Sequence, residues 1–157
     1  MTEEPVEIYT DGSCHTQHKI GTWAAILFSG KEKKILAGIE KDTTHNRMEL
    51  TAVIKAIEYA RTHYKKVCIR VFTDSQYVTV LPARKEKLVS TDFITGKGAA
   101  LQNADLIKIF FIAISVLDIA FIKIKAHQKK DDTINYNREA DMLSRKLLRA
   151  GIEDLAI

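Results

Sequence analysis

Two segments of the sequence join an apolar, strand-like run to the same Thr-Asp step. "IYTDGS" places Asp11 after one run, and "VFTDSQ" places Asp74 after another. Taken singly, each aspartate fits a structural role, Asp11 as a turn former and Asp74 as the N-cap of a helix that begins at Ser75. Open α/β sheets bind ligands beyond the carboxyl ends of their strands, so the repeated step also indicates a shared site at one sheet edge.

A third carboxylate, Glu49, falls on the apolar face of a helix predicted over residues 46–62. At about 100° per residue, the positions within roughly 80° of it are Val53, Ala56, Ile57 and Ala60. A charged group on that face is costly unless it is paired or bound to a metal, so a salt bridge and a metal site both remain open. A fourth carboxylate, Asp141, lies at the margin of the last predicted helix's apolar stripe, between Leu148 and Arg145, and alone is typical of a surface aspartate.

If these four carboxylates converge, their mutual repulsion requires cations in the same place. Oxygen ligands in a partly open site favour Mg²⁺ or Mn²⁺. A pair of such ions about 4 Å apart activates a water on one side of a phosphodiester and stabilises the leaving oxygen on the other. Four carboxylates with basic residues around them therefore indicate phosphodiester hydrolysis.

The elements that must position these residues indicate an α/β fold, a mixed five-stranded sheet with helices on both faces. Strands are predicted over residues 6–10, 22–29, 34–39, 66–73 and 119–125. Short links make the first three an antiparallel meander, and the fourth, apolar on both sides, is typical of a buried central strand. Helices are predicted over residues 46–62, from Ser75 with an interruption at Pro82, over 103–115, and over 137–150 with an end at Gly151. The helix over 103–115 is apolar on most sides and is expected to be largely buried, whereas residues 83–99 are expected to form a helix with a loop or a protruding arm.

The composition is that of an ordinary globular protein, with 46% hydrophobic and 28% charged residues among 157. We expect one domain over residues 1–157, and a cytoplasmic location because neither a signal peptide nor a membrane span is recognisable. Two cysteines, Cys14 and Cys68, are too few for a disulfide framework and are expected to be reduced. The net charge of +4 is weak evidence for a polyanionic partner. Basic residues gather around His127 and in the last helix, which fits either nucleic-acid binding or a solvated face: Lys123, Lys125, Lys129, Lys130, Arg138, Arg145, Lys146 and Arg149.

Five segments, in this order and at comparable intervals, resemble ribonuclease H of type 1: "YTDGSC", "TTHNRMEL", "FTDSQYV", "IKAHQ" and "NREAD". The resemblance covers roughly residues 6–150. It implies a ribonuclease H-like fold and a cellular enzyme with a single catalytic domain. It also implies hydrolysis of the RNA strand of RNA/DNA hybrids with Mg²⁺ or Mn²⁺, two ions in each site with substrate, leaving 5′-phosphate and 3′-hydroxyl ends.

The resemblance also implies roles for individual residues. The metal ligands would be Asp11, Glu49, Asp74 and Asp141, and His127 would assist proton transfer or product release. The expected substrate contacts are Gly12, Ser13 and Cys14 at the RNA strand, Thr44 near a DNA phosphate, and His45, Asn46 and Gln76 at the hybrid's minor groove or nearby. From the residues alone, a helix cap or a surface position is the favoured explanation for Thr44, Asn46 and Gln76.

Three stretches depart from the family pattern. The loop after Cys14, "HTQHKIG", lacks the Asn-Pro-Gly pattern of bacterial members, and the segment from His127 to Asp141 is a few residues longer. Residues 83–101 stand in the place of a basic, tryptophan-rich protrusion but contain no tryptophan. We therefore expect a weaker grip on substrate there, through phosphate contacts that salt screens.

Other readings of the four carboxylates predict different sequences. Integrases, transposases and junction resolvases share the fold with two or three of them, but Glu49 within "NRMEL" directly after the third strand favours ribonuclease H. A non-catalytic nucleic-acid-binding module would be expected to lack at least one carboxylate, and none is missing. A detached domain of a reverse transcriptase remains an alternative, although a chain that runs from Met1 through 157 residues favours a free-standing enzyme. We separately expect a monomer.

Overall fold

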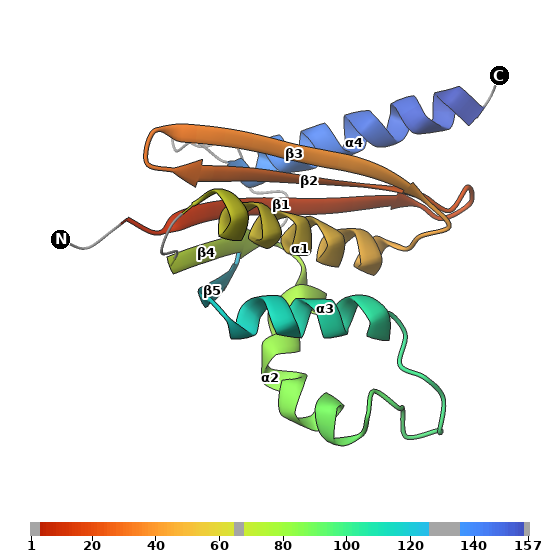
Figure 1. Ribbon diagram of the computed structural model, residues 1–157. Coiled ribbons are helices and arrows are strands. Elements are labelled where there is room, and N and C mark those ends of the chain that lie inside the picture. Colours follow the sequence, from red (N-terminus) through yellow and green to blue (C-terminus); the bar gives the residue numbers. More distant parts are fainter. Residues whose placement is uncertain (1–3, 65–67, 126–135, 156–157) are drawn as a thin grey trace.

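The computed structural model describes residues 4–64, 68–125 and 136–155, and its elements are drawn in Figure 1. The strands are β1 (Val6–His15), β2 (Ile20–Ser29), β3 (Glu32–Lys41), β4 (Cys68–Thr73) and β5 (Asp118–Lys123). The helices are α1 (His45–His63), α2 (Gln76–Ser90), α3 (Ala104–Ser115) and α4 (Tyr136–Leu155).

The strands form one mixed sheet in the order β3-β2-β1-β4-β5. β1, β2 and β3 pair antiparallel, whereas β4 runs parallel to both β1 and β5. Helix α1 packs on one face and α4 on the other, both over β1 and β2, as Figure 1 shows. The predicted α/β fold, with an antiparallel meander and helices on both faces, is therefore confirmed.

β1 is longer than the sequence suggested, and this changes the place of Asp11. The strand continues through Asp11, which pairs with Ala24 of β2, and it ends only at His15. The reason is that β2 begins at Ile20 and offers ladder partners along its whole length. The prediction that the strand ends before Asp11 is wrong, and Asp11 is not a turn former.

The core lies between the sheet and α1, where Ile8, Leu50 and Ile57 are fully buried. α1 is covered on a second side by α3, so Thr51, which the helix periodicity places on the far side from the sheet, is also buried. Residues of a helix that is sandwiched between two layers are buried over more than one stripe. Glu49 therefore sits in a helix segment with little access to water.

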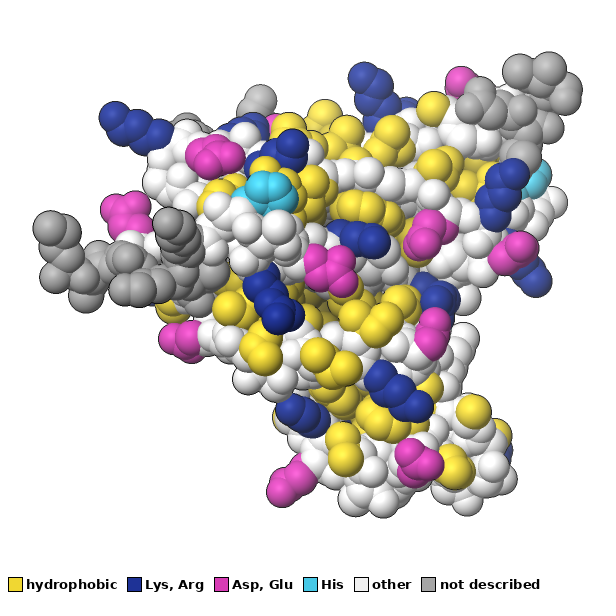
Figure 2. All heavy atoms as spheres, in the orientation of Figure 1, with side chains coloured by type: hydrophobic (Ala, Val, Ile, Leu, Met, Phe, Trp, Pro, Cys, Tyr) yellow, Lys and Arg dark blue, Asp and Glu magenta, His cyan; other side chains and the backbone are white. Residues whose placement is uncertain are grey.

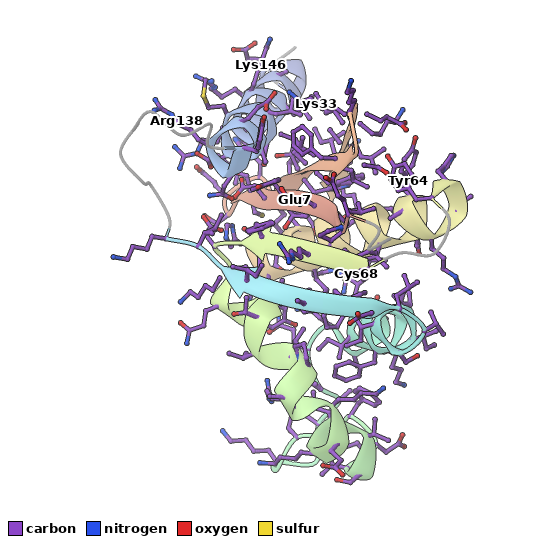
Figure 3. All side chains as sticks on the ribbon, turned by 90° about the vertical axis from the view of Figure 1, so that its left-hand side faces the viewer. Glu7, Lys33, Tyr64, Cys68, Arg138 and Lys146 are labelled. Atoms are coloured by element: carbon purple, nitrogen blue, oxygen red, sulfur yellow. The ribbon has the colours of Figure 1, made fainter. Side chains whose placement is uncertain are left out.

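β4 lies inside the sheet as predicted, but it is buried on one face only. Ile69 and Val71 point into the core, whereas Cys68 and Arg70 are exposed. α4 lies over the neighbouring strands β1 and β2, and Figure 3 shows Cys68 away from that helix. The prediction of a strand buried on both sides is wrong for this reason.

Of the two helices between β4 and β5, α2 extends away from the sheet, whereas α3 lies beside α1 (Figure 1). α2 runs without a break through Pro82, because Leu81 and Leu88 anchor both halves of the helix in the core. α3 buries Ile107, Phe110 and Phe111 but leaves Ile112 65% exposed, so it is less buried than predicted. The predicted interruption at Pro82 is wrong as well.

α4 continues past Gly151, contrary to the prediction. A Cβ at residue 151 would overlap the Ile39 side chain of β3, so the glycine allows the helix to pass close to the sheet edge instead of ending it. None of the helices in the described parts of the chain combines the length and apolar character that crossing a bilayer requires.

Candidate active site

Asp11 and Glu49 approach each other because Gly12 lets β1 run against the first turn of α1. A Cβ at residue 12 would lie 2.6 Å from the Met48 carbonyl carbon and would overlap the Glu49 backbone nitrogen. α1 begins at this point because Thr44 is its N-cap, with its Oγ1 accepting from the Arg47 N–H at 3.3 Å. Thr44 therefore has the capping role that the sequence left open, which leaves its predicted substrate contact untested.

Asp74 follows the last residue of β4 directly and precedes α2. The cap of α2 is Ser75, whose Oγ accepts from the Val78 N–H at 3.2 Å. The alternative in which Asp74 caps this helix is therefore wrong, and its half-buried carboxylate belongs to the cavity at the end of β4.

Asp141 is presented by α4, which a buried pair of hydroxyl groups fixes to the sheet. Thr22 of β2 donates from Oγ1 to the Ser144 carbonyl oxygen at 2.6 Å, and its Oγ1 lies 3.1 Å from the Ser144 Oγ. At the start of the helix, Lys33 of β3 pairs with Glu139 at 2.8 Å; Figure 3 shows Lys33 beside α4. These contacts hold Asp141 over the same part of β1 as Asp11.

The four carboxylates line one cavity of about 440 Å³. One carboxylate oxygen from each of Asp11, Glu49 and Asp74 lies within 4.8 Å of the others. Asp11 is 4% and Glu49 1% exposed, yet Asp11 Oδ2 and Glu49 Oε2 have no hydrogen-bond partner. Buried carboxylate oxygens without partners are costly, which indicates that a ligand outside the chain satisfies them.

The electrostatics of the cavity oppose full ionisation of its carboxylates. Burial, followed by the charges of Asp141 and Asp74, raises the pKa of Asp11 from 3.8 to about 8. Burial also raises the pKa of Glu49, and the charges of Asp11 and Asp74 add to the effect, while the Gly12 backbone N–H stabilises the ionised form. The neighbouring negative charges that raise these pKa values also attract a divalent cation, and binding of that cation would displace the proton.

The donor set fits Mg²⁺ or Mn²⁺. All ligand atoms are carboxylate oxygens, which hard divalent cations prefer, and the cavity is open enough for waters and a substrate phosphate. Two buried oxygens without partners are what such a cation would satisfy. The residues that would hold it are Asp11, Glu49, Asp74 and Asp141.

Two cationic or potentially cationic side chains contact this acidic group. His45 Nε2 lies 3.4 Å from Glu49 Oε1, one turn earlier on α1. Arg145 donates from Nε to Asp141 Oδ1 at 3.0 Å, one turn later on α4. Both residues line the same cavity as the carboxylates.

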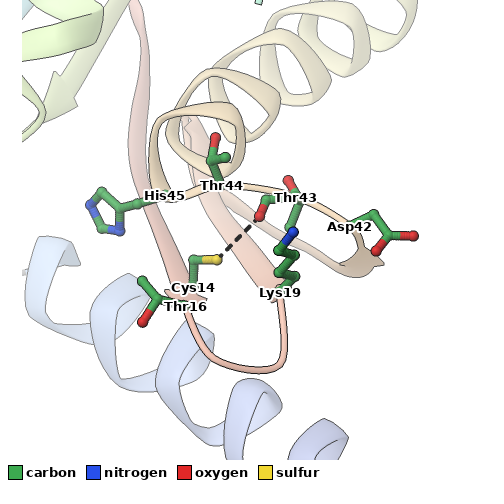
Figure 4. Close-up of a pocket in the computed structure, with 7 residues that line it drawn as sticks. All are labelled: Cys14, Thr16, Lys19, Asp42, Thr43, Thr44 and His45. Atoms are coloured by element: carbon green, nitrogen blue, oxygen red, sulfur yellow. Dashed lines mark hydrogen bonds between the residues drawn. The ribbon is translucent and has the colours of Figure 1, made fainter.

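A second cavity of about 320 Å³ lies beside the first, between the β1–β2 turn and the start of α1 (Figure 4). Cys14, Thr44 and His45 line it, together with Thr16, Lys19, Asp42 and Thr43. The Cys14 thiol donates to the Thr43 carbonyl oxygen at 3.5 Å, and burial raises its pKa, so Cys14 is present as a thiol at neutral pH. His45 belongs to both cavities and lies between them.

The structure brings together most of the residues that the sequence singled out. The carboxylate cavity is lined by Asp11, Glu49, Asp74 and Asp141 and by Gly12, Ser13, His45, Asn46 and Gln76. Cys14 and Thr44 lie in the adjacent cavity. His127 and the lysines at 129 and 130 lie outside the described residues. The roles assigned to all of these residues remain predictions.

Three further residues of the carboxylate cavity, Ser75, Tyr77 and Arg145, were not predicted to belong to the site, although Arg145 was counted among the basic residues of the last helix. Ser75 and Tyr77 flank Gln76 and follow Asp74 closely, so their positions in the sequence could have predicted that they line the cavity. Arg145 follows Asp141 by four residues, which places the two on one face of a helix. Lys19 and Asp42 of the second cavity are far apart in sequence, and nothing in their local pattern indicates that they meet.

Comparison with known proteins places the chain beside RNase H sequences. Residues 3–149 match the family described as RNase H. A ribonuclease H of Dechloromonas aromatica is 35% identical over 156 residues, covering 98% of this chain and 97% of the relative. A ribonuclease H of Acetivibrio thermocellus is 34% identical, covering 88% of this chain and 91% of the relative.

Solved structures show the same fold. A crystal structure of LC9-RNase H1, a type 1 RNase H with the type 2 active-site motif, superimposes with a TM-score of 0.77 at 19% identity, over 93% of this chain and 72% of that one. The solution structure of the PFV RNase H domain gives a TM-score of 0.68 at 24% identity, with 90% of each chain covered. At these identities the likeness concerns the fold alone.

Proposed function

Since this chain belongs to the RNase H family and is an endoribonuclease H, a phosphodiester hydrolase, we propose that it cleaves the RNA strand of RNA/DNA hybrids at the four-carboxylate cavity. The observation that carries the proposal is the convergence of Asp11, Glu49 and Asp74 within 4.8 Å, with Asp141 lining the same cavity. Family membership alone leaves the chemistry of this chain's site open, and these carboxylates supply the ligands that the chemistry requires.

We further propose that the four carboxylates hold two Mg²⁺ or Mn²⁺ ions when substrate is bound. Such a pair supplies an activated water and stabilisation of the leaving oxygen, so that cleavage leaves 5′-phosphate and 3′-hydroxyl ends. Asp11 is the central residue, because it lies between the ligands from α1, β4 and α4 and both Asp74 and Asp141 act on its pKa. Gly12 and the paired strands around it fix this arrangement before substrate arrives.

The other cavity residues suit a substrate backbone. Ser13, Asn46 and Gln76 offer hydroxyl and amide groups, which hold sugars and base edges without strong sequence preference. Cys14 and Thr44 extend the surface along the second cavity (Figure 4), beside Lys19. We propose that a hybrid lies across both cavities, with His45 between them.

The described surface exerts only a modest long-range electrostatic attraction on an RNA/DNA hybrid. On the face that Figure 2 shows, basic and acidic side chains are interspersed, in keeping with a net charge of +4. α2 and the following turn carry Arg84, Lys87 and Lys97, all exposed, at the protruding part of the molecule. We propose that these make only phosphate contacts, so hybrid affinity falls steeply with salt.

We also propose that residues 1–157 form one catalytic domain that acts as a monomer on a hybrid duplex. Location in the cytoplasm stays a prediction from the sequence. His127 stays a proposed aid to proton transfer or product release.

The direct test is a cleavage assay with four labelled substrates of one sequence: an RNA/DNA hybrid, single-stranded RNA, duplex RNA and duplex DNA. With Mg²⁺ or Mn²⁺ we expect cleavage of the RNA in the hybrid only. The products should carry 3′-hydroxyl ends that a polymerase extends and 5′-phosphates that a ligase accepts. Hybrid binding without cleavage under either metal would instead identify a non-catalytic module and contradict the proposal.

A further inference from the structure

Arg145 is the only lysine or arginine among the described residues that line the carboxylate cavity. Its Nε donates to Asp141 Oδ1 at 3.0 Å, while its side chain remains 55% exposed. Asp141 is also the carboxylate that does not join the group of three whose oxygens lie within 4.8 Å of one another. The ligand presented by α4 is therefore held by an arginine of the same helix.

From this arrangement we propose that Arg145 alternates between two partners, and this inference rests on the proposed function. Without substrate it pairs with Asp141 and competes with a divalent cation for that carboxylate. When the hybrid binds, Arg145 turns to a backbone phosphate and releases Asp141 to the cation. Arg145 thus couples substrate binding to metal binding. It contacts a substrate phosphate and does not contact the reacting water.

The chemistry of the pair allows such an exchange. A phosphodiester oxygen and a carboxylate oxygen are equivalent acceptors for a guanidinium group, and arginine presents several donors to either. An exposed pair between residues one helical turn apart is weak, so a substrate phosphate can displace it at little cost. The positive charge of Arg145 also acts on Asp11, because it lowers the pKa of the Asp11 carboxyl and so opposes the effect of burial.

If Arg145 exchanges between Asp141 and a substrate phosphate, its loss should change the affinity for the cation and the affinity for the hybrid in opposite directions. Loss of Arg145 removes a competing positive charge from Asp141, so the cation should bind more tightly in the absence of hybrid. The same loss removes a phosphate contact, so the hybrid should bind less tightly in the absence of metal. A residue that only stabilises α4 would move neither affinity in this opposed manner.

The test compares Arg145→Gln with Arg149→Gln, which makes the same change of charge one turn further along α4 at an exposed residue outside the cavity. Mn²⁺ affinity is measured by titration calorimetry without nucleic acid. Hybrid affinity is measured by fluorescence anisotropy in EDTA, where no turnover occurs. Far-UV circular dichroism and the thermal midpoint establish that each variant is folded, and Arg145→Lys serves as a charge-preserving variant.

For Arg145→Gln we expect Mn²⁺ to bind on the order of threefold more tightly and the hybrid about tenfold more weakly than in the wild type. Arg149→Gln should leave Mn²⁺ affinity unchanged and weaken the hybrid little, and Arg145→Lys should fall between Arg145→Gln and the wild type. The inference is overturned if Arg145→Gln matches Arg149→Gln, or if only one of the two affinities changes. Failure of the proposed function itself would appear separately, as wild-type protein that does not cleave the hybrid.

Discussion

Gly12 of β1 and Glu49 of α1 are in backbone contact, because residue 12 carries no Cβ. A Cβ there would overlap the Glu49 backbone nitrogen and lie 2.6 Å from the Met48 carbonyl carbon. Both neighbours are backbone atoms of a helix packed against the sheet, so neither can move aside as a side chain could. The close approach of the Asp11 and Glu49 carboxylates depends on this glycine.

The first prediction is that Gly12→Ala separates β1 from the start of α1 and loses both stability and hybrid cleavage. We expect a loss of about 1–3 kcal/mol in the free energy of unfolding, as for overpacked cores, measured by urea denaturation. The matched control is Gly96→Ala, because residue 96 has no atom within 4 Å of an added Cβ. Equal stability and activity of the two variants would contradict the role of Gly12.

The second prediction concerns the stability of metal-free protein as a function of pH. The pKa of Asp11 is about 8 in the folded chain and close to 3.8 when unfolded. Between these values the folded state holds a proton that the unfolded state has lost, so stability is highest below about pH 4 with respect to this group and falls as pH rises through 8. The slope is at most about 1.4 kcal/mol per pH unit for one group.

The measurement is urea denaturation in EDTA from pH 5 to 8.5 for wild type, Asp11→Asn and Asp118→Asn. Asp118 is an exposed aspartate on β5 and controls for a simple change of charge. Asp11→Asn should flatten the decline, and Asp118→Asn should retain it. Addition of Mg²⁺ or Mn²⁺ to the wild type at pH 8 should restore stability. A decline that persists unchanged in Asp11→Asn would show that Asp11 does not carry the proton.

Much of this fold was accessible from the sequence because its signals are local. Alternating apolar residues located the strands, and three- and four-residue spacing located α1 and its buried Glu49. The predictions that were wrong concerned where elements end, which depends on residues far away in the sequence. β1 continues through Asp11 because β2 pairs with it, and α4 continues past Gly151, which lies against Ile39 of β3.

The carboxylates of the candidate site also differ in whether a local sequence signal identifies them. Asp74 could be found because its Thr-Asp step repeats that of Asp11, and Glu49 because it lies on the wrong face for a surface residue. Asp141 could not be separated from a surface aspartate by its own helix. Its position over β1 depends on contacts such as Thr22 with Ser144, which are 122 residues apart. No local pattern predicts such a pair.

The third prediction is that Thr22→Val weakens the attachment of α4 to the sheet. Thr22 is fully buried, and the change removes its hydrogen bond to Ser144 while preserving shape. We expect a loss of about 1 kcal/mol in the free energy of unfolding, measured by urea denaturation. Thr62→Val is the control, because Thr62 is exposed and its hydroxyl donates to the Glu58 carbonyl within one helix. That variant should stay within about 0.5 kcal/mol of wild type.

The fourth prediction is that the ion pair between Arg47 and Asp105 contributes little to the free energy of unfolding. Arg47 at the start of α1 makes paired hydrogen bonds of 2.9 Å to Asp105 at the start of α3. These bonds lower the pKa of Asp105 from 3.8 to about 2, so the stability they contribute is present above pH 3.8 and lost as pH falls through 2. The Asp105 side chain is 65% exposed, and solvent screens the pair. Asp105→Asn should therefore cost less than about 1 kcal/mol at pH 7, and a larger loss in urea denaturation would contradict this assignment.

The most direct test of the central claim is Asp11→Asn, assayed on one preparation for hybrid cleavage with Mg²⁺ or Mn²⁺ and for the thermal midpoint in EDTA. If Asp11 is the central ligand of a metal site, cleavage falls by at least about 100-fold while the midpoint is equal to or higher than that of wild type, because asparagine avoids the cost of burying a carboxylate beside Asp74 and Asp141. Cleavage at the wild-type rate, or a marked fall in the midpoint, would contradict the claim and assign Asp11 a structural role.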